Sequence, residues 1–198
     1  MRQYNREKHH RHSIRLPGYD YSQPGAYFVT ICTQNRECLF GEIVNGEMIL
    51  NEYGNRVERC WVEIPHHFSH VALDEFVAMP NHVHGVIVIV ENVGARHVGA
   101  RYVGARYVGA RHAVPPHNSN QCIEQFGKPV RGSIPTIIRS FKSAVTKQIN
   151  EIRQTPGMPV WQRNYWEHII RDEHELNRIR QYIRNNPMNW KNNDNFDK

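Results

Sequence analysis

Two histidines one residue apart, His82 and His84, stand at the start of an apolar run in the segment MPNHVHGVIVIV. In a β-strand, residues i and i+2 point to the same face with Cα atoms about 7 Å apart, so two neutral imidazoles could bind one divalent ion. The chain has 13 histidines in 198 residues, and a second H-x-H pair, His10 and His12, lies near the N-terminus. Because such a pair also arises by chance, a metal site needs a third ligand from elsewhere in the fold.

The last predicted helix offers a third ligand and a nucleophile. Tyr182 and Asn186 lie one turn apart on the same flank, about 40° from each other around the axis. Tyr182 stands at the edge of the apolar stripe formed by Leu176, Ile179 and Ile183. The Asn186 amide oxygen suits a hard metal ion, and the Tyr182 phenol could attack a substrate that the metal polarises. A tyrosine that only packs against the sheet remains the alternative.

The net charge limits the substrates of such a site. The chain carries a formal charge of +6 and has a pI near 9.3, which favours a polyanionic partner and, with a metal site, a phosphodiester; a basic surface that only promotes solubility is the alternative. The four cysteines form no C-x-x-C pair, and neither a secretion signal nor a membrane-spanning run is present. We therefore expect a cytoplasmic protein with free thiols.

The elements that must position these residues follow from periodicity and turn signals. Asn45-Gly46 predicts a tight hairpin, Pro65 is expected to end the first helix, and Asp172 with Glu175 predicts a capping box on the last. Val83, Ile87 and Ile89 alternate with Val86 and Val88, so the His82 strand is apolar on both faces and central. Strands are expected over 26–35, 41–50, 71–80, 82–90 and 160–170, and helices over 51–64, 133–152 and 172–187.

The chain divides into a domain and less regular parts. We predict a basic N-terminal arm over 1–25, one domain over 26–190, and a short tail over 191–198. Within the domain, residues 91–132 form an insert that contains four copies of VGAR[HY], a period too short for a solenoid; it either contacts nucleic acid or is inert. The candidate phosphate-binding cations are Arg11, Arg15, Arg139, Lys142, Lys147 and Arg163. Of these, Arg139, Lys142 and Lys147 lie off the apolar stripe of their helix and are expected to face outward.

Four segments in this order carry a family resemblance: RLPGYDYSQPGAYFVTICTQNRECLFGEI, AMPNHVHGVIVIV, IPTIIRSFKSAVTKQIN and VWQRNYWEHIIRDEHELNRIRQYIRNNP. Together they resemble the REP-associated tyrosine transposases, a branch of the HUH single-strand endonucleases, over most of residues 13–190. The most specific element is the paired-histidine strand followed by W-Q-x-x-Y-W-E-H and Y-I-x-x-N-P.

The resemblance implies an α+β, ferredoxin-like antiparallel sheet with helices packed on one face. It implies that His82 and His84 bind Mg²⁺ or Mn²⁺, that Asn186 is the third metal ligand, and that Tyr182 is the single nucleophile. The implied reaction cleaves and rejoins single-stranded DNA at palindromic hairpins through a 5′-phosphotyrosine link and a free 3′-OH, by a monomer or a homodimer.

Other readings of the same residues stay open. The chain could be a DNA-hairpin-binding protein without turnover, or a metal-dependent phosphodiesterase that uses activated water. Tyr165 is the rival nucleophile, and strand alternation could equally bury it. Glu167 and His168 border the site by family analogy and either assist substrate placement or serve the structure.

Overall fold

A four-stranded antiparallel sheet forms the centre of the protein, with the strand order β4-β5-β1-β6. The computed structural model describes Leu16, residues 18–90 and residues 130–190. The sheet strands are β1 (Gly25–Cys32), β4 (Val71–Met79), β5 (His82–Ile89) and β6 (Trp166–Ile170). The helices are α1 (Glu52–Val62), α2 (Ile64–His67), α3 (Ile134–Ile152) and α4 (Glu173–Asn185).

The order of the elements gives the predicted ferredoxin-like topology. Strand β1, helix α1, strands β4 and β5, helix α3 and strand β6 form a β-α-β-β-α-β unit whose first and third strands occupy the centre of the sheet. The expected α+β class and antiparallel sheet are confirmed. No helix in the described part of the chain is long and apolar enough to cross a bilayer.

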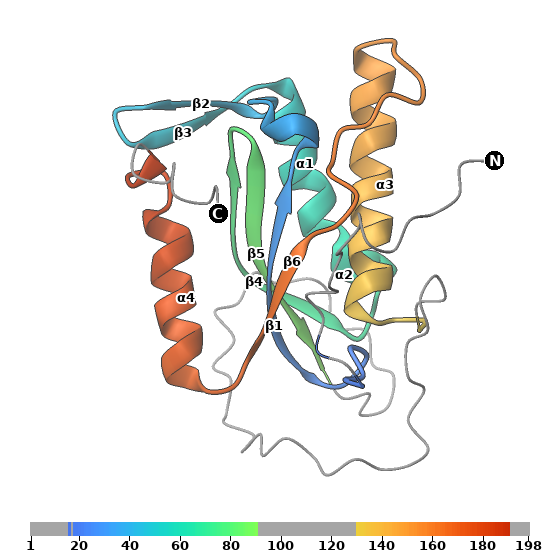
Figure 1. Ribbon diagram of the computed structural model, residues 1–198, viewed down its shortest axis with the longest axis vertical. Helices are drawn as coiled ribbons and strands as arrows, with labels where there is room; N and C mark the ends of the chain where they lie inside the picture. Colours follow the sequence, from blue (N-terminus) through green and yellow to red (C-terminus); the bar gives the residue numbers. More distant parts are fainter. Residues whose placement is uncertain (1–15, 17, 91–129, 191–198) are drawn as a thin grey trace, which may run out of the picture.

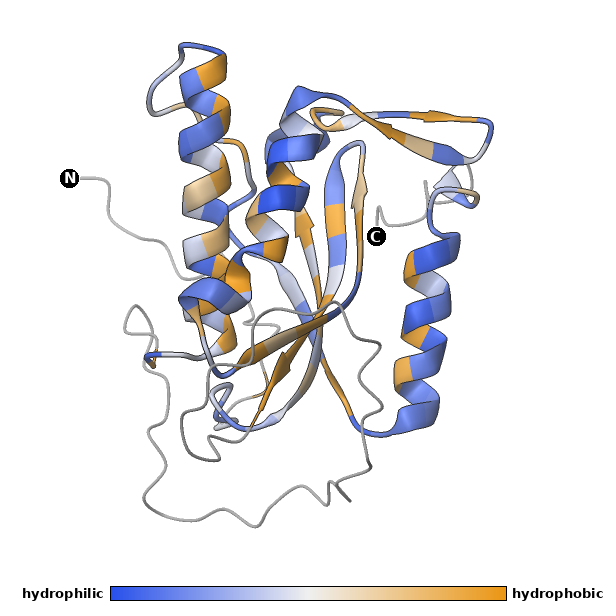
Figure 2. Cartoon of the chain, turned by 180° about the vertical axis from the view of Figure 1, so that it is seen from behind, coloured by the Kyte–Doolittle hydropathy of each residue, from blue (hydrophilic) through white to orange (hydrophobic). Residues whose placement is uncertain are grey.

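The prediction that the helices share one face is wrong for α4. Helices α1 and α3 lie on one side of the sheet and α4 lies alone on the other (Figure 1). The physical reason is the two-sided apolar pattern of the central strands. Tyr27 and Ile87 belong to the cluster under α1 and α3, whereas Phe28 and Val86 belong to the cluster under α4. Figure 2 shows apolar residues on the side of α4 that faces the sheet and polar residues on its outer side.

Gly85 lets the larger cluster pack tightly beside the histidine pair. A Cβ atom on Gly85 would overlap the Trp61 ring of α1, which is fully buried. Trp61 also stacks on Phe76 with ring centroids 4.7 Å apart. The residue next to His84 is therefore fixed by the packing of the opposite face of the sheet.

The hairpin and the start of the last helix form as predicted. β2 (Gly41–Val44) and β3 (Glu47–Leu50) pair across Asn45 and Gly46, whose φ angles of 52° and 83° are those of a hairpin turn. Asp172 caps α4 by accepting a hydrogen bond of 2.7 Å from the backbone N–H of Glu175. The Glu175 carboxylate, however, accepts from the N–H of Arg171 rather than from Asp172.

Two local predictions are wrong. The first helix ends at Val62, and Pro65 stands in the first turn of α2, where its missing N–H costs nothing. Ser133 is the N-cap of α3, and its hydroxyl donates to the Val130 carbonyl. Residues 160–165 are not part of the strand: an isolated bridge joins Trp161 to Thr33, and Gln162 N–H donates to the Cys32 carbonyl at the end of β1. A short 3-10 helix, η1 (Gln34–Arg36), follows β1.

A candidate active site beneath the last helix

His82 and His84 lie on the face of the sheet that α4 covers, with their Nε2 atoms 3.1 Å apart. Each ring is held through its other nitrogen. His82 Nδ1 lies 2.7 Å from Oδ1 of Asn81, and His84 Nδ1 lies 2.8 Å from the hydroxyl oxygen of Thr30 on β1. Such partners fix the orientation of imidazoles that bind metal ions.

The two partners set the tautomers differently. Oδ1 of Asn81 can only accept, so His82 carries its proton on Nδ1 and turns a bare Nε2 toward His84. The Thr30 hydroxyl can donate or accept, so His84 can carry its proton on either nitrogen. With that proton on Nε2, His84 donates to His82; with it on Nδ1, both Nε2 atoms present lone pairs to one shared position.

Burial keeps both histidines neutral. It lowers the pKa of His82 to about 4, with a smaller contribution from the positive charge of Arg36. Burial also lowers the pKa of His84 well below its ordinary value, assisted by His82. Neutral imidazole is the form that binds a metal ion. Two nitrogens that share one ion through bonds of about 2.0–2.1 Å lie roughly 3 Å apart, so the pair fits a divalent cation.

Tyr182 reaches the histidine pair from α4. Its hydroxyl oxygen lies 3.3 Å from Nε2 of His84, and its ring lies against His84 and Phe28 at centroid distances of 5.2 and 6.0 Å. Burial raises the pKa of Tyr182, while the side chain of Asn186 acts in the opposite direction. Asn186 caps the end of α4 and is 1% exposed. The fold thus brings Tyr182 to the two histidines and sets Asn186 beside it.

The side chains near His82 and His84 limit which groups could complete a metal site. Within the residues that the structure describes, no three His, Cys, Asp or Glu side chains are grouped to hold a metal ion. A site at His82 and His84 would therefore take its third protein ligand from an amide such as Asn186. Mixed imidazole and amide oxygen donors are compatible with Mg²⁺ or Mn²⁺.

Two aromatic residues of the site are not apparent from the sequence pattern. Trp190, which follows α4, stacks on His82 with centroids 5.9 Å apart and an angle of 25° between the rings. Phe28 of β1 lies against His84 at 5.4 Å. Both contacts arise from the tertiary fold, and only the density of aromatic residues in the two segments could have suggested them.

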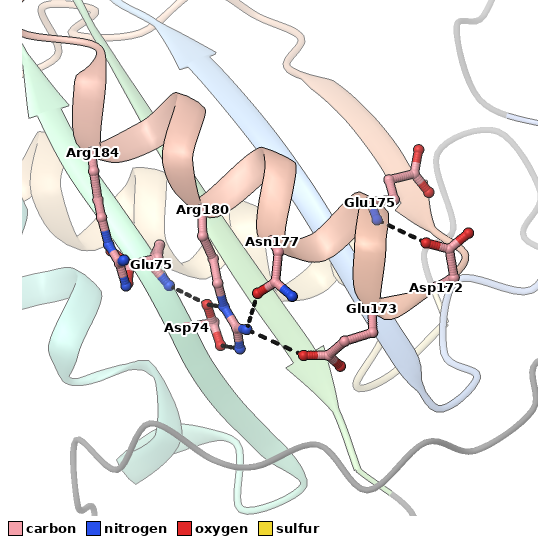
Figure 3. A network of polar contacts seen from close by, with 8 residues as sticks. All are labelled: Asp74, Glu75, Asp172, Glu173, Glu175, Asn177, Arg180 and Arg184. Carbon is pink, nitrogen blue, oxygen red and sulfur yellow. Dashed lines mark hydrogen bonds and ion pairs between the residues drawn. The ribbon is translucent and has the colours of Figure 1, made fainter.

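A polar clamp holds the opposite flank of α4 on the edge strand β4 (Figure 3). Arg180 donates hydrogen bonds of 2.7 and 2.6 Å to the two carboxylate oxygens of Asp74, and Arg184 pairs with Glu75. The strand register shifts between Leu73 and Phe76, so this irregularity contains both acids. The signal in the sequence is an acidic pair inside an apolar strand, together with arginines four residues apart on a helix.

The clamp determines which way Tyr182 points. Residues two apart on a helix lie about 200° apart around its axis, so α4 turns Arg180 to β4 and Tyr182 to the other side. Burial would raise the pKa of Asp74, but the hydrogen bonds and charge of Arg180 bring it below its ordinary value. The ion pair is therefore intact at neutral pH.

A cleft of about 830 Å³ opens on the Tyr182 flank of α4. Aromatic and polar side chains of β1, β5, β6, α4 and the segment before β6 line it, among them Phe28, His84, Tyr165, Trp166, His168 and Tyr182. Tyr165 directly precedes β6 and lines the same cleft. Glu167 is buried and, by strand alternation, lies on the face opposite the cleft, whereas His168 lines the cleft.

The predicted phosphate-binding residues differ in their exposure and in their contacts. Arg139, Lys147 and Arg163 are exposed, and Lys147 lies 3.9 Å from Glu151. Lys142 does not face outward as expected: its ammonium donates to the backbone carbonyls of Gln162 and Arg163, and burial lowers its pKa to about 8. Arg11, Arg15, His10, His12 and the VGAR[HY] insert lie outside the described residues.

Comparisons with known proteins fall into two kinds. A Haemophilus influenzae protein of uncharacterized function is 43% identical over 187 residues, which are 94% of this chain and 93% of that protein. The structure of a REP-associated tyrosine transposase bound to a REP hairpin matches 89% of this chain and 73% of its own, with 15% identity and a TM-score of 0.53. A candidate transposase from Deinococcus radiodurans matches 86% of this chain and 95% of its own, with 16% identity and a TM-score of 0.43. No protein-family model matches the sequence.

Proposed function

We propose that this chain is a metal-dependent tyrosine transposase. The chain belongs to one family with the Haemophilus influenzae protein, and it has the fold of the hairpin-bound transposase. It cleaves and rejoins single-stranded DNA at palindromic hairpins. One observation carries the proposal: the Tyr182 hydroxyl lies 3.3 Å from Nε2 of His84, which itself lies 3.1 Å from Nε2 of His82.

His82, His84 and Asn186 would hold the divalent ion, Mg²⁺ or Mn²⁺. When bound, the ion polarises the phosphate and neutralises charge that develops on it. Because burial raises the pKa of the Tyr182 phenol, the free tyrosine is protonated at neutral pH. The Asn186 amide, which acts in the opposite direction on this pKa, favours the phenolate needed for attack.

Strand cleavage is then a transesterification. The Tyr182 oxygen forms a bond to phosphorus, and the bond from phosphorus to the 3′-oxygen breaks. The phenol loses its proton, and the leaving 3′-oxygen takes up a proton to become a hydroxyl. One phosphodiester bond is exchanged for another, so rejoining needs no nucleotide energy. One chain supplies Tyr182 and both histidines, so a monomer contains these groups without a partner.

The test is a denaturing-gel assay with Mn²⁺ and labelled hairpin oligonucleotides taken from the repeats that flank the gene. We expect a covalent protein–DNA band in the wild type and in Tyr165→Phe, the matched control that alters the other cleft-lining tyrosine. The band should be absent in Tyr182→Phe and in His82→Ala, and absent when EDTA is added.

Other outcomes would replace the proposal with one of its alternatives. Cleavage that persists in Tyr182→Phe without a covalent band would indicate activated water as the nucleophile. A band lost in Tyr165→Phe and kept in Tyr182→Phe would assign the attack to Tyr165. Tight hairpin binding without cleavage, whichever divalent metal ion is added, would indicate a DNA-binding protein without catalytic activity.

A further inference from the structure

Trp166 is a large apolar side chain that the fold leaves open in the cleft. It is the first residue of β6, lines the cleft and is 45% exposed. Ile170, four residues further along the same face of β6, is 6% exposed. An indole that is half-exposed in a concave site leaves apolar ring surface in contact with water, and aromatic residues that bind ligands have this property.

The indole is held rigidly by its neighbours. Its ring stacks on His168 with centroids 5.8 Å apart and an angle of 4° between the planes. It meets Phe28 edge to face at 5.5 Å. His168 is fixed in turn by Glu175 of α4, whose Oε1 lies 2.8 Å from its Nε2. A planar group that entered the cleft would thus find a preorganised stacking surface rather than a mobile side chain.

The sheet register relates this surface to the candidate catalytic groups. His84 of β5 pairs with Thr30 of β1, and Thr30 pairs with Trp166 of β6, so the three residues form one row across the sheet. Adjacent strands lie about 4.8 Å apart, which sets the backbones of His84 and Trp166 roughly 10 Å apart. Phe28, which meets the Tyr182 ring at 6.0 Å, fills the space between the indole and the nucleophile.

The remaining walls of the cleft suit a nucleotide. Gln162 and Asn164 line it with groups that can both donate and accept hydrogen bonds, and Arg36 and Arg178 line it with positive charge. The Arg178 side chain is 70% exposed and reaches Glu175 only at 3.6 Å. An aromatic surface beside amides and cations is the combination by which proteins hold an unpaired base and its phosphates.

We propose that Trp166 stacks one unpaired base of the DNA strand next to the phosphate that Tyr182 attacks. The substrate class rests on the proposed function, but the base site itself requires no chemistry. Stacking of a base on an aromatic side chain contributes about 1–3 kcal/mol and tolerates any base. Trp166 is therefore a positioning contact that fixes the strand relative to Tyr182.

The experiment measures binding where no reaction can occur. All variants are made in the Tyr182→Phe background with EDTA, and the probes are fluorescent hairpin oligonucleotides with unpaired flanks on both sides of the stem. One set carries a single abasic nucleotide at each flank position in turn. Trp166→Ala is compared with Trp166→Phe and with Ile49→Ala, a matched control that removes a 50% exposed apolar side chain from the β2–β3 hairpin.

We expect Trp166→Ala to weaken binding roughly 5- to 100-fold, Trp166→Phe to weaken it less, and Ile49→Ala to leave it unchanged. One abasic position should weaken the Trp166-containing protein by a similar factor and have no further effect in Trp166→Ala, because both changes remove the same contact. Trp166→Ala binding as tightly as its parent, or effects that add fully, would overturn the base site.

The two proposals fail differently. If no covalent band forms but Trp166→Ala weakens binding as expected, the proposed transposase activity is overturned and the base site is supported. A covalent band with no Trp166 effect would do the opposite. Absence of hairpin binding in every variant would overturn both.

Discussion

Arg180 and Asp74, 106 residues apart in the sequence, are joined by two hydrogen bonds between the guanidinium of α4 and the carboxylate of β4. Their side chains are 16% and 13% exposed, so little water screens the pair. The contact joins the helix that carries Tyr182 to the sheet that carries His82 and His84. It is a bidentate, charge-assisted contact, a kind that is stronger than a neutral hydrogen bond, and it forms part of the network that Figure 3 shows.

Removing this link should destabilise the protein by loosening the attachment of α4, which carries Tyr182, to the sheet. Arg180→Met leaves the buried Asp74 carboxylate without its guanidinium partner, and we expect the free energy of unfolding to fall by about 1–3 kcal/mol. Urea denaturation measures this. Arg56→Met, at an exposed pair with Glu52, is the control and should change stability by less than about 0.5 kcal/mol. Equal effects of the two variants would contradict the clamp.

The Arg180–Asp74 pair predicts that the stability of the protein depends on pH in the acidic range. The pKa of Asp74 is below its ordinary value in the folded chain, so the unfolded chain binds the proton first as the pH falls. The stability that the carboxylate contributes is complete above about pH 4, its ordinary pKa, and is lost as the pH falls through the folded-state value. Stability curves of the wild type and Asp74→Asn should therefore converge in acid, and curves that stay parallel down to unfolding would contradict this.

Lys142 should make stability depend on pH in a second, alkaline range. Its pKa is lowered to about 8 by burial, below the ordinary value of about 10.4, so between these values the unfolded chain binds more protons and the contribution of Lys142 to stability rises with pH. The free energy of unfolding of the wild type minus that of Lys142→Met should increase across this range. A difference independent of pH would mean that Lys142 titrates normally.

Thr30→Val should weaken metal binding without unfolding the protein. Valine has the shape of threonine but cannot accept the Nδ1 proton of His84, which then has no partner in the tautomer that exposes Nε2 to a cation. We expect Mn²⁺ affinity to fall roughly 10- to 100-fold, as measured by calorimetry. Thr30→Ser keeps the hydroxyl and should restore most of the affinity; equal affinities of Thr30→Val and the wild type would exclude this role.

Gly85→Ala should destabilise the protein through the opposite face of the sheet. The added methyl group overlaps the Trp61 ring, and overpacking of a core typically costs about 1–3 kcal/mol. Thermal unfolding of Gly85→Ala measures the loss. In the Trp61→Phe background the smaller ring leaves room for the methyl group, so the same change should cost less; full additivity of the two changes would show that they do not meet.

The sequence predicts those features that depend on local pattern. The two-sided apolar run from Val83 to Ile89 identifies β5 as a central strand, Asn45-Gly46 identifies the hairpin, and Asp172 marks the start of α4. The position of Tyr182 at the edge of its apolar stripe places its hydroxyl beside the sheet. Each of these properties is set within a few residues by periodicity, turn geometry or capping.

Features that depend on tertiary pairing could not be predicted. The clamp depends on Asp74 and Glu75, which lie at the register shift in β4 and reach two arginines of α4. Residues 160–165 lie outside β6, and their contacts with the end of β1 depend on tertiary structure. The outward orientation expected for Lys142 fails for the same reason: two carbonyls of that irregular segment lie within reach of its ammonium. Position on a helical stripe gives no information about such partners.

Glu175 belongs to two parts of the molecule at once. One carboxylate oxygen accepts the Arg171 N–H at the start of α4, and the other holds His168, on which Trp166 rests. The first turn of α4, the helix that carries Tyr182, and the floor of the cleft are therefore joined through one carboxylate. If a DNA base stacks on Trp166 as proposed, its contact reaches the start of α4 through His168 and Glu175.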